Sequence, residues 1–222
     1  LNNCLSRTEL SINEVNKAFI FAAAGNDVRS VIAIYDYGPI QTFMFNRMNA
    51  FHAAVLRGNR EVAEFILNTG KADPNIRING TTSFIESIKR GRTEIACSII
   101  KTKRVNYENT SESKTPLFIA AELGNISVVR EIINCANIDF NAGNRSDQSP
   151  LYIACELGFP DVVDELASIE VVDINKKDTN GQTPLYTAAM NGRIEIVKNL
   201  FTFADLQKGA LTNMKESVLY AA

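Results

Sequence analysis

The sequence predicts an all-α solenoid, a stack of similar helix-turn-helix units rather than one closed globule. Three observations predict it. Six glycines recur 33 or 34 residues apart along the 222-residue chain, at Gly25, Gly58, Gly91, Gly124, Gly158 and Gly192. The residues around these glycines repeat as well, and apolar residues after each glycine recur at helical spacing. A fixed period of this length is typical of proteins whose units each contact only their neighbours.

Each unit is expected to begin with a short first helix that ends at its glycine. The three clearest copies read TPLFIAAELG, SPLYIACELG and TPLYTAAMNG. A hydroxyl side chain suits the N-cap, and proline suits the next position because no amide hydrogen is needed there. These pairs are Thr115 and Pro116, Ser149 and Pro150, and Thr183 and Pro184. The glycine then ends the helix by adopting positive φ at little steric cost.

Such a first helix is only about nine residues long, too short to be stable alone, so its neighbours must hold it. Small residues recur three and four positions before the glycine, where they let adjacent helices approach closely: Ala120 and Ala121, Ala154 and Cys155, and Ala188 and Ala189. A second helix follows each glycine, and a turn-rich stretch then leads to the next unit. The first three copies are weaker, since Lys17, Ala50 and Ser83 stand where the later copies have proline.

This pattern resembles the ankyrin repeat, from roughly residue 12 to residue 222. The Pro-Leu helix starts, the small pair and the glycine carry the resemblance, together with Asp-x-Asn at Asp73/Asn75, Asp139/Asn141 and Asp173/Asn175. It implies L-shaped units, each with two antiparallel helices and a projecting β-hairpin, stacked into a curved solenoid. We expect a single domain over residues 1–222, with about six full repeats and the start of a seventh in SVLYAA. Because the chain begins with Leu1 and ends inside that seventh copy, we also expect a fragment of a longer protein.

Composition argues against several classes of function. The chain is 45% hydrophobic and 22% charged, which is ordinary for a soluble folded protein. A net charge of −2 favours neither nucleic acid nor an acidic membrane, and no apolar run reaches the ~20 residues that span a bilayer. Residues 1–111 carry 14 basic and 10 acidic side chains, and residues 112–222 carry 9 and 15. Either this asymmetry is random or it matches a partner of complementary polarity.

Few residues are candidates for chemistry. His52 is the only histidine, and the resemblance implies a structural hydrogen bond for it, the alternative being catalysis or metal binding. The four cysteines, Cys4, Cys97, Cys135 and Cys155, form no CxxC pair, so we expect buried free thiols in a reducing compartment, cytoplasmic or nuclear. One histidine and scattered cysteines assemble no zinc cluster, and neither common phosphate-loop motif is present. We therefore expect no catalysis, cofactor or metal.

The positions one and two before each glycine carry long and diverse side chains, which indicates that they do not face the stack. The resemblance implies that they line a concave groove beside the hairpin tips. The aromatic and Met-rich loop from Phe43 to Met48 either binds a partner or packs on a neighbouring hairpin. The predicted partner-binding residues are Phe45, Met48, Leu56, Arg57, Lys89, Arg90, Glu122, Leu123, Glu156, Leu157 and Met190.

The sequence thus predicts a monomeric interaction scaffold that binds a protein or peptide. Nucleic acid would favour a continuous basic surface, which this chain lacks. The alternative is the targeting or regulatory arm of a larger enzyme, channel or secreted effector whose activity lies outside this chain. Neither hypothesis identifies the partner.

Overall fold

The computed structural model describes residues 11–37, 49–108, 113–135 and 138–203. The chain divides into two compact units, Leu1–Asn106 and Tyr107–Ala222. In the first unit the described helices are α2 (Ile12–Ala24), α3 (Val28–Tyr37), α4 (Ala50–Arg57), α5 (Arg60–Asn68), α6 (Ser83–Lys89) and α7 (Thr93–Lys101). In the second they are α8 (Pro116–Glu122), α9 (Ile126–Cys135), α10 (Pro150–Leu157), α11 (Pro160–Ala167), α12 (Pro184–Met190) and α13 (Ile194–Leu200). The predicted all-α repeat fold is confirmed, and the expectation of one domain stays a prediction.

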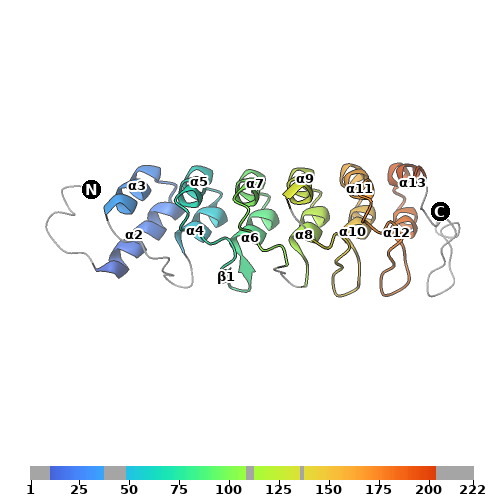
Figure 1. The fold of residues 1–222 in the computed structure, drawn as a ribbon, viewed down its shortest axis with the longest axis horizontal. Helices are drawn as coiled ribbons and strands as arrows, with labels where there is room; N and C mark the ends of the chain where they lie inside the picture. The colour runs from blue at the N-terminus through green and yellow to red at the C-terminus, as the bar shows by residue number, and fades with distance from the viewer. Residues whose placement is uncertain (1–10, 38–48, 109–112, 136–137, 204–222) are drawn as a thin grey trace. The chain divides into compact units, whose positions relative to one another are not determined.

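Within each unit the helices form two rows (Figure 1). In the first unit α2, α4 and α6 pack in one row, and α3, α5 and α7 pack in the other. In the second unit α8, α10 and α12 are the first helices, and α9, α11 and α13 are the second helices. Side chains buried between the rows form the core, such as Ile85 and Ile99 in the first unit and Leu117 and Val129 in the second.

Capping side chains start the first helices where the sequence predicts. Thr115, Ser149 and Thr183 accept hydrogen bonds from backbone amides three residues later, at 3.1–3.2 Å, and a proline follows each of them. These N-cap assignments are confirmed. The helix α2 differs, because it begins upstream of Lys17. Ser11 and Glu14 form a capping box there, in which each side chain bonds to the other residue's backbone amide.

Five of the six periodic glycines end their helix with positive φ, as expected; Gly158, for example, has φ of 89°. The expectation is wrong for Gly25, whose φ is −84°. The left-handed residue there is Asn26, with φ of 59°. Asparagine tolerates this conformation better than most residues, so the reversal shifts by one position in the first repeat.

At Gly58, Gly124 and Gly158 the residue after the next glycine packs against the glycine of the preceding repeat. A methyl group on Gly124 would lie 2.6 Å from the Phe159 ring, and one on Gly58 would lie 2.6 Å from the guanidinium carbon of Arg92. In the same register, Asn59 donates hydrogen bonds to the carbonyl oxygens of Ala23 and Ala24, at the end of α2. The glycines therefore serve close packing between repeats as well as helix termination.

The Asp-x-Asn motifs link successive repeats. The side chain of Asn141 donates to the carbonyl oxygen of Val171 and accepts from the amide of Asp173, both at 2.8 Å. In the first unit Asn75 makes the same pair of bonds, at 2.7 Å each, to the carbonyl of Arg104 and the amide of Asn106. In both motifs the aspartate carboxylate accepts a hydrogen bond from the backbone amide of the asparagine two residues later. This bond fixes the turn from which the asparagine side chain reaches the next repeat.

The projecting loops are hairpins of different regularity. Strands β1 (Arg77–Ile78) and β2 (Thr81–Thr82) pair antiparallel, with Arg77 opposite Thr82. Both turn residues, Asn79 and Gly80, have positive φ, which the tight turn of a two-residue hairpin requires. In the second unit the loops close by side-chain turns instead. There Asp178 accepts the amides of Asn180 and Gln182, and Lys176 pairs with Asp147 of the adjacent loop at 2.8 Å.

Gly124 and Gly192 have nearly the same φ but different surroundings, so substituting each by alanine distinguishes the free-energy cost of the backbone conformation from that of side-chain packing. Gly124 has φ of 64° and contacts Phe159, whereas Gly192 has φ of 65° and no atom of the described residues within 4 Å of an added methyl. Gly192→Ala should lower the free energy of unfolding by about 1–2 kcal/mol, the cost of left-handed backbone. Gly124→Ala should lower it by about 1–3 kcal/mol more, because the ring must move. Urea unfolding of both variants measures the difference, and equal losses would show that Phe159 relaxes at no cost.

Candidate partner-binding surface

We define the pre-glycine surface as the residues one and two positions before the repeat glycines. In the first unit these are Leu56, Arg57, Lys89 and Arg90, and in the second they are Glu122, Leu123, Glu156, Leu157, Met190 and Asn191. The five residues directly before Gly58, Gly91, Gly124, Gly158 and Gly192 are exposed, and two positions before these glycines the residues are exposed or half-buried, as Leu56 is. Gly25 differs, because Ala24 is half-buried and Ala23 is fully buried. The predicted site residues Phe45 and Met48 lie outside the described residues.

The neighbouring framework positions are buried. Ala120, Ala121, Ala154 and Cys155 are fully buried between the helices. Ala189 is the exception in this set, since it is partly exposed on α12. The first helices thus bury their small residues in the stack and expose the diverse residues that follow.

An exposed apolar row marks the second unit. Leu123 is 47% exposed, Leu157 is 40% exposed and Met190 is 56% exposed. They occupy the C-terminal ends of α8, α10 and α12, three first helices that pack in order. Leu123 and Leu157 lie directly before their glycines, and Met190 lies two positions before Gly192. Each of the three repeats therefore exposes one large apolar side chain at the end of its first helix, where it can meet a partner that is itself apolar along one side.

Ion pairs within the fold reduce the charge that this surface presents. Glu122 pairs with Lys114 at 2.6 Å in the second unit, and Arg90 pairs with Glu86 at 2.9 Å in the first. Arg57 and Glu156 form no ion pair with any described residue. The unneutralised charges of the surface are thus positive at Arg57 and negative at Glu156. The sequence could not separate these from the paired residues, because Lys114 and Glu122 are eight positions apart and meet only through the fold.

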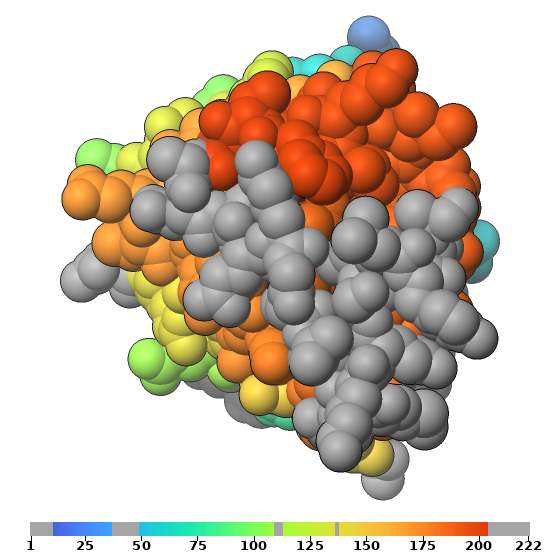
Figure 2. All heavy atoms as spheres, turned by 90° about the vertical axis from the view of Figure 1, so that its right-hand side faces the viewer, coloured from blue at the N-terminus to red at the C-terminus, as the bar shows by residue number. Residues whose placement is uncertain are grey.

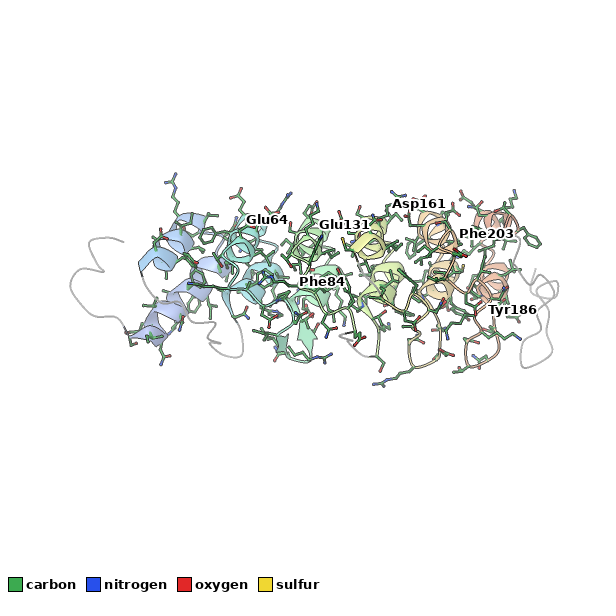
Figure 3. The ribbon with its side chains drawn as sticks, viewed as in Figure 1. Glu64, Phe84, Glu131, Asp161, Tyr186 and Phe203 are labelled. Carbon is green, nitrogen blue, oxygen red and sulfur yellow. The ribbon has the colours of Figure 1, made fainter. Side chains whose placement is uncertain are left out.

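The opposite side of each unit is formed by the second helices. Figure 3 shows Glu64 on α5, Glu131 on α9 and Asp161 on α11, whereas Phe84 and Tyr186 belong to the first helices. Polar links also join neighbouring second helices. Ser98 donates to Glu64 at 2.9 Å, and Arg130 pairs with Glu165 at 2.7 Å. Figure 2 shows α13 at the end of the second unit, in red.

His52 makes a structural hydrogen bond. It is 3% exposed, and its Nδ1 lies 3.0 Å from the hydroxyl oxygen of Ser83 in the next repeat. Ser83 is the residue that replaces the framework proline, so the third repeat gains a partner for the histidine where it lacks proline. Burial lowers the pKa of His52, although the nearby carboxylate of Glu86 partly offsets this effect. The imidazole is therefore neutral and held within the repeat interface.

Only one of the three described cysteines is buried. Cys155 lies wholly inside the second unit, where burial raises the pKa of its thiol. Cys97 is half-buried and Cys135 is exposed, so the expectation of a buried thiol is wrong at Cys135, which is the last residue of α9. Cys4 lies outside the described residues. Over the described ranges no three side chains of the types His, Cys, Asp and Glu come together as metal ligands would.

None of the helices in the described parts of the chain combines the length and apolar character that crossing a membrane requires.

A family model described as "Ankyrin repeats (3 copies)" matches residues 52–144, 84–178 and 136–210. Together these matches cover residues 52–210, which is well over half of the chain. A search of curated proteins found no match.

Solved structures show the same fold at low sequence identity. The human ASB11 ankyrin repeat domain has a TM-score of 0.71 and 20% identity, covering 92% of this chain and 90% of that one. The ankyrin repeat domain of Bcl-3, titled a unique member of the IκB protein family, has a TM-score of 0.79 and 17% identity, covering 92% and 93%. The ankyrin repeat protein EF0377 has a TM-score of 0.77 and 24% identity, covering 85% and 98%. At these identities the likeness concerns the fold alone.

The buried histidine predicts a pH dependence of stability. His52 has a lower pKa in the folded chain than when unfolded, so the unfolded chain takes up its proton first as the pH falls below about 6.5. Stability attributable to His52 is thus complete above that pH, and by pH 5.5 up to about 1.4 kcal/mol is lost. The measurement is urea unfolding of the wild type and His52→Gln at pH 7.5 and 5.5. The wild type should lose more stability than the variant, since carboxylates contribute equally to both; equal losses would contradict the assignment.

Proposed function

This chain belongs to the ankyrin repeat family, and on that premise we propose that it is an interaction scaffold whose pre-glycine surface binds a protein or peptide. Ankyrin repeats are generally protein-interaction modules, and this fold typically carries no catalysis of its own. The observation that carries the proposal is the row formed by Leu123, Leu157 and Met190. Each of these residues lies at the end of a first helix, one or two positions before the glycine, in three successive repeats. Large apolar side chains exposed together in this way are typical of a binding surface.

The partner is an amphipathic segment that crosses successive first helices. Its apolar side chains lie against the exposed row, and its polar side chains contact the hairpin tips beside that row. Methionine suits such a surface, since its unbranched side chain adapts to the shape of an apolar group. A segment of this kind binds in what the family resemblance implies is the concave groove.

Charge gives each unit its own preference for the partner's groups. In the first unit the unpaired Arg57 attracts an acidic group, and in the second unit the unpaired Glu156 attracts a basic one. Exposed charges of this kind act mainly on the rate and orientation of association. The composition of the sequence has the same sign difference, because residues 1–111 carry 14 basic and 10 acidic side chains and residues 112–222 carry 9 and 15.

The remaining properties in the proposal follow from the same reasoning. The scaffold acts as a monomer without catalysis, and nucleic acid is not its partner in this proposal because residues 112–222 carry 15 acidic and only 9 basic side chains. A reducing compartment, cytoplasmic or nuclear, suits the thiols of Cys97, Cys135 and Cys155.

The apolar row is tested by truncation. A partner is first isolated by affinity capture with the full chain, and its binding is then measured by surface plasmon resonance. Leu123→Ala with Leu157→Ala should weaken binding about tenfold or more, mainly through faster dissociation, because apolar anchors act after encounter. Val171→Ala is the matched control, since Val171 is exposed and apolar but follows a second helix of the same unit. Normal binding by the double variant, with weakened binding by the control, would refute the proposed surface.

The charge arrangement is tested by reversing single residues. Arg57→Glu and Glu156→Lys should each slow association about threefold or more at low salt and reduce its dependence on salt, because both charges attract the partner. Arg29→Glu makes the same change on α3, a second helix, and should leave association unchanged. The test measures the association rate of the wild type and of each variant at low and at high salt. Slowing by the control to the same extent would show that net charge alone steers the partner.

A further inference from the structure

An apolar pocket lies in the first unit, apart from the pre-glycine surface. Its wall comes from α2, α3, α4 and α5 and from the loop after α5, and its cavity volume is about 50 Å³. Phe19, Phe51, Ile66 and Ile76 supply most of the apolar wall. The pocket reaches the N-terminal end of α4, whereas the pre-glycine residues occupy the other end of that helix.

One polar side chain in this wall lacks a hydrogen-bond partner. Asn16 on α2 is only 4% exposed, and within the described part of the chain its Nδ2 amide has no hydrogen-bond partner. A buried amide donor left unsatisfied costs stability, so native proteins rarely keep one without a reason. An asparagine at this apolar position is explained if a bound group supplies the missing acceptor.

The other polar groups of the pocket favour an oxygen acceptor as well. The ammonium group of Lys71 lies 4.6 Å from the centre of the Tyr35 ring, and both residues line the pocket. The carboxylate of Asp73 already accepts the amide of Asn75 at 2.9 Å. The pocket therefore offers donors at Asn16 and Lys71, and its only carboxylate is engaged in a turn.

We propose that this pocket binds a compact branched aliphatic group that carries a carbonyl or carboxylate oxygen, with the oxygen accepting a hydrogen bond from Asn16. The volume sets the size of the group. A single water molecule needs about 10–15 Å³ of such space, so the pocket accepts about four heavy atoms, the size of an isobutyl group. Two sources offer this chemistry, a leucine-like residue of a peptide and a free branched carboxylic acid.

The test uses the full chain with labelled isoleucine methyl groups, observed by nuclear magnetic resonance. N-acetyl-leucine methylamide represents the peptide and 4-methylpentanoate represents the free acid. At least one of them should shift the methyl signals of Ile20, Ile66 and Ile76 in a saturable way at millimolar concentration, and the tighter of the two identifies the source. N-acetyl-alanine methylamide, which lacks the branched group, should bind more weakly. Absence of saturable shifts with both compounds, as when the chain fills the pocket itself, would overturn the proposal.

Two variants separate the hydrogen bond from the apolar contact. Asn16→Leu should weaken binding about fivefold or more, because the donor is lost, and should raise the thermal midpoint because no unsatisfied amide remains. Asn13→Leu makes the same change at an exposed position of α2 and should leave both properties unchanged. Ala72→Leu keeps Asn16 but fills the pocket, so it should abolish binding even if Asn16→Leu does not fold. Wild-type affinity in either pocket variant would overturn the proposal.

Discussion

At Gly58, Gly124 and Gly158 the side chain that follows the next glycine lies against the glycine of the repeat before it, and the packing of these repeats depends on this contact. The first helices have seven or eight residues in most repeats, too few to persist alone. Their stability comes from neighbours that approach closely, as Phe159 approaches Gly124 and Arg193 approaches Gly158. The same contact fixes the register of successive helices. Because the register is fixed, residues before the glycines form rows instead of scattered points.

Ion pairs within the fold leave the pre-glycine surface with fewer unpaired charges than its sequence indicates. Lys114 and Glu86 neutralise two of its charged residues from within the fold. A partner that approaches this surface meets an apolar row and few unpaired charges. Recognition then depends on shape and on a small number of electrostatic contacts, so related partners can be distinguished by the spacing of their apolar residues.

The sequence predicts what local chemistry controls. The helix starts at Thr115, Ser149 and Thr183 follow from hydroxyl caps before proline, and the glycine ends follow from backbone conformation. Local chemistry also explains the exception at Gly25, where Asn26 adopts the left-handed conformation. The spacing of the glycines alone does not predict this exception. The ion pair of Lys114 with Glu122 and the pocket around Asn16 depend on distances between elements, which no single segment encodes. Arg92 and Phe159, which pack on Gly58 and Gly124, both stand directly after a periodic glycine. Their shared role is hard to recognise in the sequence because an arginine and a phenylalanine have unlike side chains.

The asparagine links between repeats involve only backbone groups of the following repeat. Asn75 and Asn141 each bond to one carbonyl and one amide, about thirty positions further along the chain. Since every residue except proline provides both of these backbone groups, the joint places little demand on the side chains of the neighbour. Repeats with divergent sequences can thus follow one another, as they do in this chain. Duplication or loss of one whole repeat would restore the same joint, so a lineage can lengthen or shorten such a protein by complete units while the interior of each unit evolves separately.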